Sequence, residues 1–182
     1  FVFKTKKETS DFKLKHKIKL PERPFRIRSN NDDLLIISLY QDILIYDKKM
    51  NETKIKVPFH LDEIYPHTNF IFALATQKIG QKILISITYD GKILPLKENV
   101  DSFFVCHDFD LLFALSGTEI FVTSTSHINF TTFISTDSIP IGVTVPNSIC
   151  AFITAKNNYS KIEPCLSYFY DYAISMNGHF SS

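Results

Sequence analysis

Short apolar runs recur along this chain at nearly equal intervals. They begin at residues 34, 70, 111 and 149, so the intervals are 36, 41 and 38 residues. Each run is preceded by a short strand-like stretch, and the first three are followed by two more. Four strands in about 40 residues is the period of a β-propeller blade. The spacing therefore constrains the fold more than any single motif does.

The apolar runs lack the alternation of a strand that has one solvated face. The stretches "LLIIS" at 34–38 and "LLFALS" at 111–116 are apolar almost throughout. Such strands are buried on both faces. A small four-stranded sheet reaches that state when neighbouring sheets stack around an axis and cover one another. We therefore expect Ile36 and Phe113, on these runs, to be buried.

The repeat predicts an all-β chain that forms part of a WD40-like β-propeller, with three whole four-stranded blades and a partial blade at each end. The expected divisions are a basic end of a preceding blade at 1–23, blades at 24–60, 61–100 and 101–137, and the start of a further blade with a polar tail at 138–182. Because a ring has about 4 to 8 blades, we expect a longer polypeptide. A two-sheet sandwich is the weaker alternative, because it does not require near-equal four-strand periods.

Two Tyr-Asp dipeptides occur near the expected ends of third strands. Tyr46-Asp47 and Tyr89-Asp90 take the place that a Trp-Asp dipeptide has in WD40 repeats. Tyr replaces Trp here, and no Gly-His dipeptide marks the start of a blade, so the repeat is degenerate. We predict that these four residues have a structural role in their blades.

Composition limits the compartment and the class of protein. With 182 residues and 45% hydrophobic residues, the chain can bury a sizeable core. Its longest apolar runs are far below the roughly 20 residues of a membrane span, so we expect no membrane insertion. An odd number of cysteines without a CxxC pair favours reduced thiols inside the cell; they are Cys106, Cys150 and Cys165. The glycosylation-type matches at Asn51, Asn129 and Asn158 keep an extracellular location open.

The first part of the chain is strongly basic. Residues 1–28 carry a net charge of +7, whereas the whole chain carries +1. Within residues 12–20, four lysines alternate with apolar residues, so an extended strand has all four on one face; they are Lys13, Lys15, Lys17 and Lys19. Such lysines protect a sheet edge from unwanted pairing, or they dock an acidic protein partner. Nucleic acid is disfavoured as a partner, because no RNA-binding signature or DNA-binding helix accompanies them.

The sequence predicts no catalytic, metal-binding or cofactor-binding residues. The stretch "CHDFD" at 106–110 combines a thiol, an imidazole and two carboxylates, but a strand points Cys106 and His107 in opposite directions. The remaining histidines lack the spacing of a zinc site. No glycine-rich phosphate loop is present. Cys106 is therefore expected to be a strand residue, followed by acidic turn residues.

The order of these elements resembles the amino-terminal propeller of subunit 1 of the anaphase-promoting complex. The resemblance covers roughly residues 30–136 and is carried by "VPF" at 57–59, by Ile64-Tyr65-Pro66 seven residues later, and by the intervals to the next two strand pairs. It implies a non-catalytic scaffold, nuclear and cytoplasmic, whose partners are other protein subunits of a large cell-cycle ubiquitin ligase. Members of that family often carry a long phosphorylated insertion near the place of residues 76–81, and this chain has none there.

Two other functions stay open at the level of the sequence. A propeller of this kind could equally serve as a scaffold in a vesicle coat, a ciliary complex or the ectodomain of a membrane-protein complex. A propeller enzyme is the third reading. It is disfavoured because convergent carboxylates or arginines are not visible in the sequence.

The basic segment gives a first testable prediction. We expect that changing Lys13, Lys15, Lys17 and Lys19 together to Ser slows incorporation into the parent assembly at low salt. Long-range attraction of an acidic partner weakens with added salt, since the screening length falls to about 8 Å at physiological ionic strength. Incorporation measured at low and moderate salt tests this. Unchanged incorporation at both would show that the lysines are only solvated edge residues.

Overall fold

The structure is a computed structural model. It describes the backbone of residues 2–6, 9–30, 33–77, 80–106, 110–135, 140–144, 151–156 and 159–164, and the side chains of residues 16–30, 33–77, 80–106, 110–131 and 135. These parts of the chain contain strands and turns and no helix, so no helix capable of crossing a membrane is found among them.

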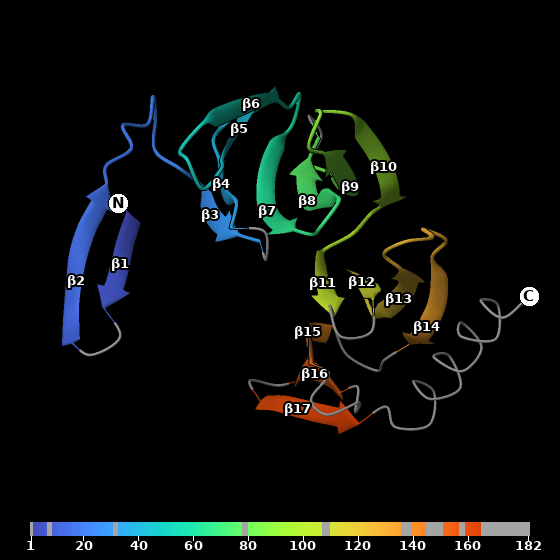
Figure 1. Ribbon diagram of the computed structural model, residues 1–182. Helices are drawn as coiled ribbons and strands as arrows, with labels where there is room; N and C mark the ends of the chain where they lie inside the picture. Colours follow the sequence, from blue (N-terminus) through green and yellow to red (C-terminus); the bar gives the residue numbers. More distant parts are fainter. Residues whose placement is uncertain are drawn as a thin grey trace, which may run out of the picture.

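Three four-stranded antiparallel sheets form the centre of the molecule (Figure 1). The first contains β3 (Arg26–Ser29), β4 (Leu35–Ser38), β5 (Asp42–Tyr46) and β6 (Glu52–Lys56). The second contains β7 (His60–Pro66), β8 (Phe70–Thr76), β9 (Lys82–Thr88) and β10 (Ile93–Glu98). The third contains β11 (Ser102–Cys106), β12 (Leu111–Ser116), β13 (Glu119–Ser124) and β14 (Thr131–Ser135). In each sheet, strands adjacent in sequence are neighbours in space.

Two smaller sheets flank these three. A two-stranded sheet pairs β1 (Val2–Lys6) with β2 (Thr9–His16). A three-stranded sheet contains β15 (Pro140–Thr144), β16 (Ala151–Lys156) and β17 (Tyr159–Pro164). The predicted all-β fold with four-stranded antiparallel units is therefore confirmed.

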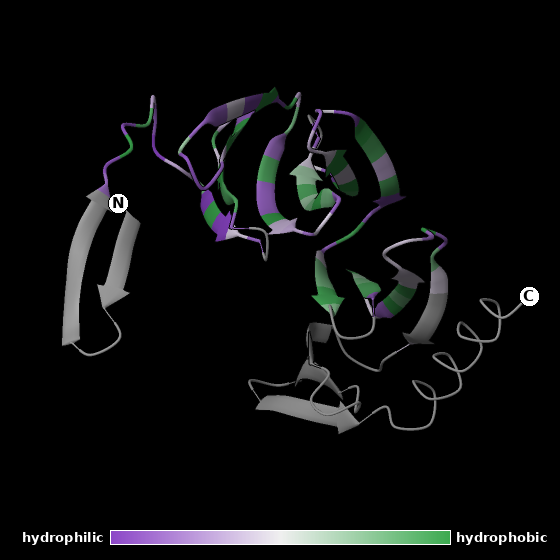
Figure 2. Cartoon of the chain, viewed as in Figure 1, coloured by the Kyte–Doolittle hydropathy of each residue, from purple (hydrophilic) through white to green (hydrophobic). Residues whose placement is uncertain are grey.

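The central strands supply side chains to both faces of their sheets. Ile71, Ala73 and Ala75 of β8 face the first sheet and pack in one cluster with Ile36 and Ile43. The intervening residues of the same strand join a second cluster with side chains of the third sheet; this cluster includes Phe72, Leu74, Leu112 and Ala114. Figure 2 shows the apolar colour of β8 and β9, in contrast to the mixed colours of β3 and β6.

The two predicted core positions are buried. Ile36 and Phe113 are each 0% exposed. Ile36 lies between the first and second sheets. Phe113 pairs with Val122 of β13 in the middle of the third sheet. The expected burial of Ile36 and Phe113 is therefore confirmed.

One backbone hydrogen bond repeats at the junctions between sheets. The amide of Val57 donates to the carbonyl oxygen of Gln41 (2.8 Å), and the amide of Val100 donates to that of Lys82 (3.3 Å). In both cases a residue shortly after the fourth strand bonds the start of the third strand: Gln41 immediately precedes β5, and Lys82 is the first residue of β9. Both valines are buried, at 2% and 1% exposure. The same bond thus fixes the exit from the first sheet and from the second.

The strand expected over residues 12–20 ends early, which corrects the sequence analysis. Strand β2 stops at His16, which pairs with Val2, and no described strand pairs with the residues that follow. The alternation nevertheless persists beyond the strand. Ile18 and Leu20 pack on the face of the first sheet that points away from the second, whereas the intervening lysines are exposed. Tertiary packing, rather than strand pairing, orders this segment.

The buried positions lead to a stability prediction. We expect Ile36→Ala and Phe113→Ala each to lower the free energy of unfolding by about 2 to 5 kcal/mol, because each leaves a cavity in a packed core. Urea unfolding of the full-length protein measures this. The matched control is Ile27→Ala on β3, where the side chain is 51% exposed; its cost should stay below about 1 kcal/mol. Equal costs at all three positions would contradict the assignment of the core.

Candidate functional site

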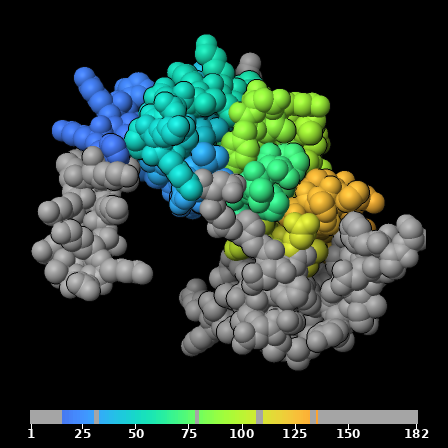
Figure 3. All heavy atoms as spheres, viewed as in Figure 1, coloured from blue at the N-terminus to red at the C-terminus, as the bar shows by residue number. Residues whose placement is uncertain are grey.

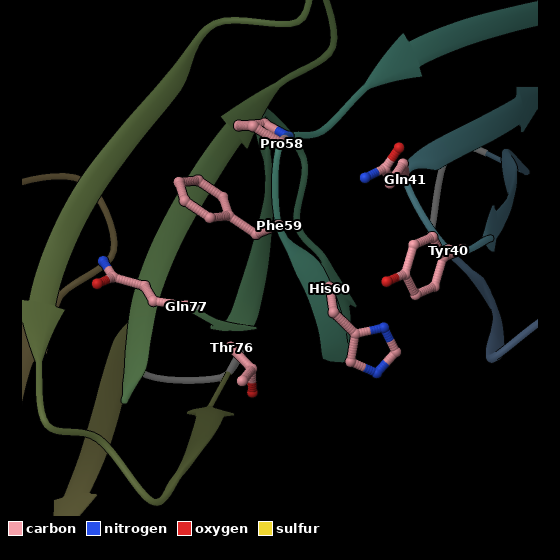
Figure 4. Close-up of a pocket in the computed structure, with 7 residues that line it drawn as sticks. All are labelled: Tyr40, Gln41, Pro58, Phe59, His60, Thr76 and Gln77. Carbon is pink, nitrogen blue, oxygen red and sulfur yellow. The ribbon is translucent and has the colours of Figure 1, made fainter. Parts of the chain in front are cut away.

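A groove crosses the junction of the first two sheets at one rim. Its volume is about 630 Å³, and Figure 4 shows seven residues that line it. They come from the turn after β4, from the connection that leads into β7, and from the end of β8. The lining residues are Tyr40, Gln41, Pro58, Phe59, His60, Thr76 and Gln77. Since the Val57 bond fixes the connection between the sheets, these side chains rest on rigid elements.

Aromatic rings gather around His60. The ring of Phe25 meets the imidazole edge to face, with 4.6 Å between centroids, and the ring of Tyr40 lies 5.8 Å from it. Phe25 is 43% exposed and Tyr40 is 55% exposed. Large aromatic side chains left half in water are costly unless something covers them, and such residues dominate binding energies at interfaces. The groove is therefore suited to binding.

A smaller groove of about 270 Å³ adjoins the first and shares Tyr40 and Gln41 with it. Pro21 and Glu22 form its other side. The Glu22 carboxylate accepts a hydrogen bond from the Tyr40 amide (2.8 Å), which fixes the basic segment against the turn after β4. The two grooves together extend from this segment to the second sheet.

The carboxylates of the two grooves are already engaged. Asp62 accepts a hydrogen bond from the Thr76 hydroxyl (2.6 Å) and lies 3.6 Å from the Lys82 ammonium. Its other oxygen lies 3.5 Å from Nε2 of His60. Asp42 pairs with Lys54 at 2.6 Å. The groove itself therefore carries little uncompensated charge, and Nδ1 of His60 is buried without a hydrogen-bond partner among the described residues.

Nothing in the described ranges assembles a metal site, since no group of three or more His, Cys, Asp and Glu side chains lies close enough to hold an ion. The "CHDFD" stretch is only partly described. Cys106 is the half-buried last residue of β11, and Asp110 accepts a hydrogen bond from the Thr125 hydroxyl. Residues 107–109 lie outside the described residues.

The four predicted contact lysines are placed in part. Lys17 and Lys19 are exposed in the segment after β2. The side chains of Lys13 and Lys15 lie outside the described residues, although the backbone of both belongs to β2. Their common role in binding stays a prediction.

Tyr46 and Asp47 close the first sheet at the opposite rim from the groove. Tyr46 is the buried last residue of β5, and its hydroxyl donates a hydrogen bond to the Glu52 carboxylate. Asp47 opens the turn that follows; its carboxylate accepts hydrogen bonds from the backbone amides of Lys49 (2.8 Å) and Asn51 (2.9 Å). The hydrogen bonds from Asn51 lower the pKa of Asp47.

The second dipeptide does not occupy the equivalent place. Strand β9 ends at Thr88, so Tyr89 and Asp90 lie in the turn after it, contrary to the expected strand end. Thr88 is the equivalent of Asp47: the amide of Thr88 donates to the carbonyl oxygen of Lys92 (2.9 Å), as the amide of Asp47 donates to that of Asn51 (3.2 Å). Both residues lie six positions after the residue that accepts the junction bond, Lys82 or Gln41, so the second Tyr-Asp dipeptide simply stands two residues later in the sequence than the first.

Tyr89 instead links two sheets. Its hydroxyl donates to the carbonyl oxygen of His67 (2.7 Å) and accepts from the side-chain amide of Asn30 (3.2 Å). Asn30 follows β3, so the bond ties the first sheet to the second. The structural role predicted for the four dipeptide residues stays a prediction.

Sequence reasoning missed the groove. Phe25 was expected within a strand, but it precedes β3 and is exposed. The exposure of Tyr40 could have been predicted from the sequence, because an aromatic residue in a short turn between two apolar strands cannot be buried in the core of the sheet. His60 gave none, since a lone histidine at the start of a strand is common.

Solved structures resemble this fold at low sequence identity. The N-terminal domain of Nup159 matches with a TM-score of 0.58 and 11% identity, over 87% of this chain and 52% of that chain. A complex of S. cerevisiae Dbp5 bound to Nup159 and Gle1, with IP6 and ADP, gives 0.55 and 11%, over 87% and 50%. Streptogramin B lyase gives 0.55 and 15%, over 80% and 56%. The chain thus spans about half the length of these structures.

These likenesses concern the fold alone: the neighbours are β-propellers, and the chain forms part of such a propeller. No family model and no curated protein matches the sequence.

Tyr46 gives a pH-dependent prediction. Burial, followed by the hydrogen bond to Glu52 and its negative charge, raises the pKa of Tyr46 to about 12. In the unfolded chain the phenol of Tyr46 ionises near pH 10. Its contribution to the free energy of unfolding is therefore complete below pH 10 and is lost as the pH rises to 12. We expect Tyr46→Phe to cost about 1 kcal/mol of unfolding free energy at pH 8.

The difference between wild type and variant should vanish between pH 10 and pH 12. Urea unfolding of both proteins at pH 8, 10, 11 and 12 measures it. A difference that stays constant across this range would contradict the account, because other alkaline titrations affect both proteins alike.

Proposed function

We propose that this chain is a non-catalytic protein-interaction propeller within a multisubunit assembly. The groove at the junction of the first two sheets carries the proposal, because exposed Tyr40 lines it and exposed Phe25 packs against His60, another of its lining residues. Patches of this composition are typical of protein interfaces.

The groups in the groove favour binding over catalysis. A general base must be free to take a proton from a substrate. Here Asp62 is engaged by Thr76, His60 and Lys82, and the imidazole of His60 packs against Phe25. One fold neighbour is a lyase, so the fold alone does not decide the matter. The bonding of these side chains supports a binding role.

The specific assembly rests on the resemblance to the anaphase-promoting complex. We propose that the chain belongs to the scaffold of that ubiquitin ligase and resides in the nucleus and cytoplasm. A fold neighbour, Nup159, occurs in a complex with Dbp5 and Gle1, which supports protein partners in general rather than this ligase. A scaffold in a vesicle coat, a ciliary complex or a membrane-protein ectodomain is the alternative.

One observation bears on the extracellular alternative. The side-chain amide nitrogen of Asn51, to which a glycan would be attached, donates a hydrogen bond to the Asp47 carboxylate (2.7 Å). Because an attached glycan replaces one of the two hydrogens on this nitrogen, the other can still donate to Asp47. Glycan mapping at Asn51, Asn129 and Asn158 therefore decides between the intracellular proposal and the extracellular alternative.

Native purification of the tagged full-length protein tests the assembly. We expect stoichiometric co-elution with subunits of the anaphase-promoting complex in a large particle. Co-elution with a different stoichiometric set would keep the scaffold role and reject the ligase. A monomer that elutes with no stoichiometric partner would overturn the proposal as a whole.

A further inference from the structure

We propose that the two adjoining grooves bind an acidic linear peptide that is anchored by one apolar side chain. The inference rests on the proposed protein-interaction function and names the partner chemistry of the same site. It follows from three features of the rim: an aromatic floor, the ion pairs that neutralise Asp42 and Asp62, and cations beside the grooves that form no ion pair among the described residues.

The aromatic floor supplies the anchor site. Tyr40 lies between the grooves and lines both, while Phe59 and His60 line only the larger one. Phe25 packs against His60 from the side of the basic segment. One apolar side chain of a peptide, inserted among these rings, covers aromatic surface that is now exposed. Anchors of this kind supply most of the affinity in peptide grooves.

Side-chain amides flank the floor. Figure 4 shows Gln41 on the side of Tyr40 and His60, and Gln77 on the side of Phe59 with its side-chain amide directed away from His60. A glutamine side chain both donates and accepts hydrogen bonds, so Gln41 can bond the backbone of an extended segment that passes over Tyr40 and His60. This suits a linear peptide better than a compact hydrophobic ligand.

The charges beside the grooves select for acidic residues. Four cationic side chains of residues 17–26, which run past the smaller groove into β3, are exposed, and none of them forms an ion pair in the described part of the chain; they are Lys17, Lys19, Arg23 and Arg26. By contrast, Lys54 and Lys82 are already paired with Asp42 and Asp62. Lys56 at the end of β6 is also exposed and forms no ion pair among the described residues, so most of the available positive charge, rather than all of it, lies on the flank of residues 17–26, where acidic residues next to the anchor would meet it.

The same groups disfavour nucleic acid. A phosphate backbone across the grooves would approach the carboxylate of Glu22, which lines the smaller groove and forms no ion pair among the described residues. A peptide avoids that repulsion, because it places its acids on the basic flank alone and its neutral backbone over the grooves.

A selection from a random peptide display library on immobilised full-length protein tests the proposal. We expect selected peptides to share one apolar residue flanked by Asp or Glu. Fluorescence anisotropy then measures the affinity of the strongest peptide. Phe25→Ser with Tyr40→Ser should weaken binding about tenfold or more, as removal of anchors does. Reversal of the four cations to Glu should weaken it about tenfold at low salt and less at high salt.

Two matched controls keep the test specific. Leu94→Ser removes an apolar side chain of similar exposure, 40%, from β10, away from the grooves. Lys49→Glu with Lys92→Glu reverses exposed charges at turns of the opposite rim. Neither should change peptide affinity, and circular dichroism confirms that each variant is folded.

Several outcomes would overturn the inference. They are selection of no peptide, selection of neutral or basic peptides, and equal affinity of the groove variants and the controls. Tighter binding of a mixed-sequence 12-nucleotide single-stranded RNA, lost in the cation variant, would assign the site to nucleic acid instead. If the inference fails while native co-elution with subunits persists, the scaffold function stands, and the protein binds its partners through another surface.

Discussion

The two-sided burial of β8 and β9 holds the described structure together. Odd-numbered residues of both strands pack toward the first sheet, and even-numbered residues toward the third. Both sheet junctions depend on the second sheet, because β8 and β9 supply side chains to each of them. The space-filling view shows the first sheet, blue to teal, in contact with the second sheet, teal-green to yellow-green (Figure 3). Stability in such an array is a sum of neighbour contacts, so the second sheet carries the largest share.

Polar ties at the two rims keep the sheets in register. At one rim, the amides of Val57 and Val100 fix the exits from the first two sheets. At the other, Tyr89 bonds both His67 and Asn30. Nε2 of His67 lies 3.7 Å from the Asp110 carboxylate, next to the third sheet. Apolar packing has no direction, whereas these bonds do, so they set the angle at which one sheet meets the next.

The groove is a product of the same junction. Two sheets that meet at an angle leave a furrow where their connecting turns diverge, and the side chains of those turns line it. Phe25 and Tyr40 come from two separate connections and His60 begins β7, yet the rings of Phe25 and Tyr40 each lie within 6 Å of the His60 imidazole. The packed cores beneath hold these connections in place, so a partner meets a preformed surface and loses little conformational entropy of the propeller on binding.

The sequence by itself determined the all-β fold, the four-strand repeat and the burial of Ile36 and Phe113, because periodic apolar runs report local burial directly. Only the tertiary structure decided the rest. It ended β2 at His16, moved Tyr89 into a turn that joins two sheets, and brought Phe25 and Tyr40 to His60. Such placements depend on strand lengths and on the angle between sheets. The rings of Phe25 and Tyr40, 35 and 20 residues before His60 in sequence, meet the imidazole only when packing sets that angle, and no pattern along the chain encodes it.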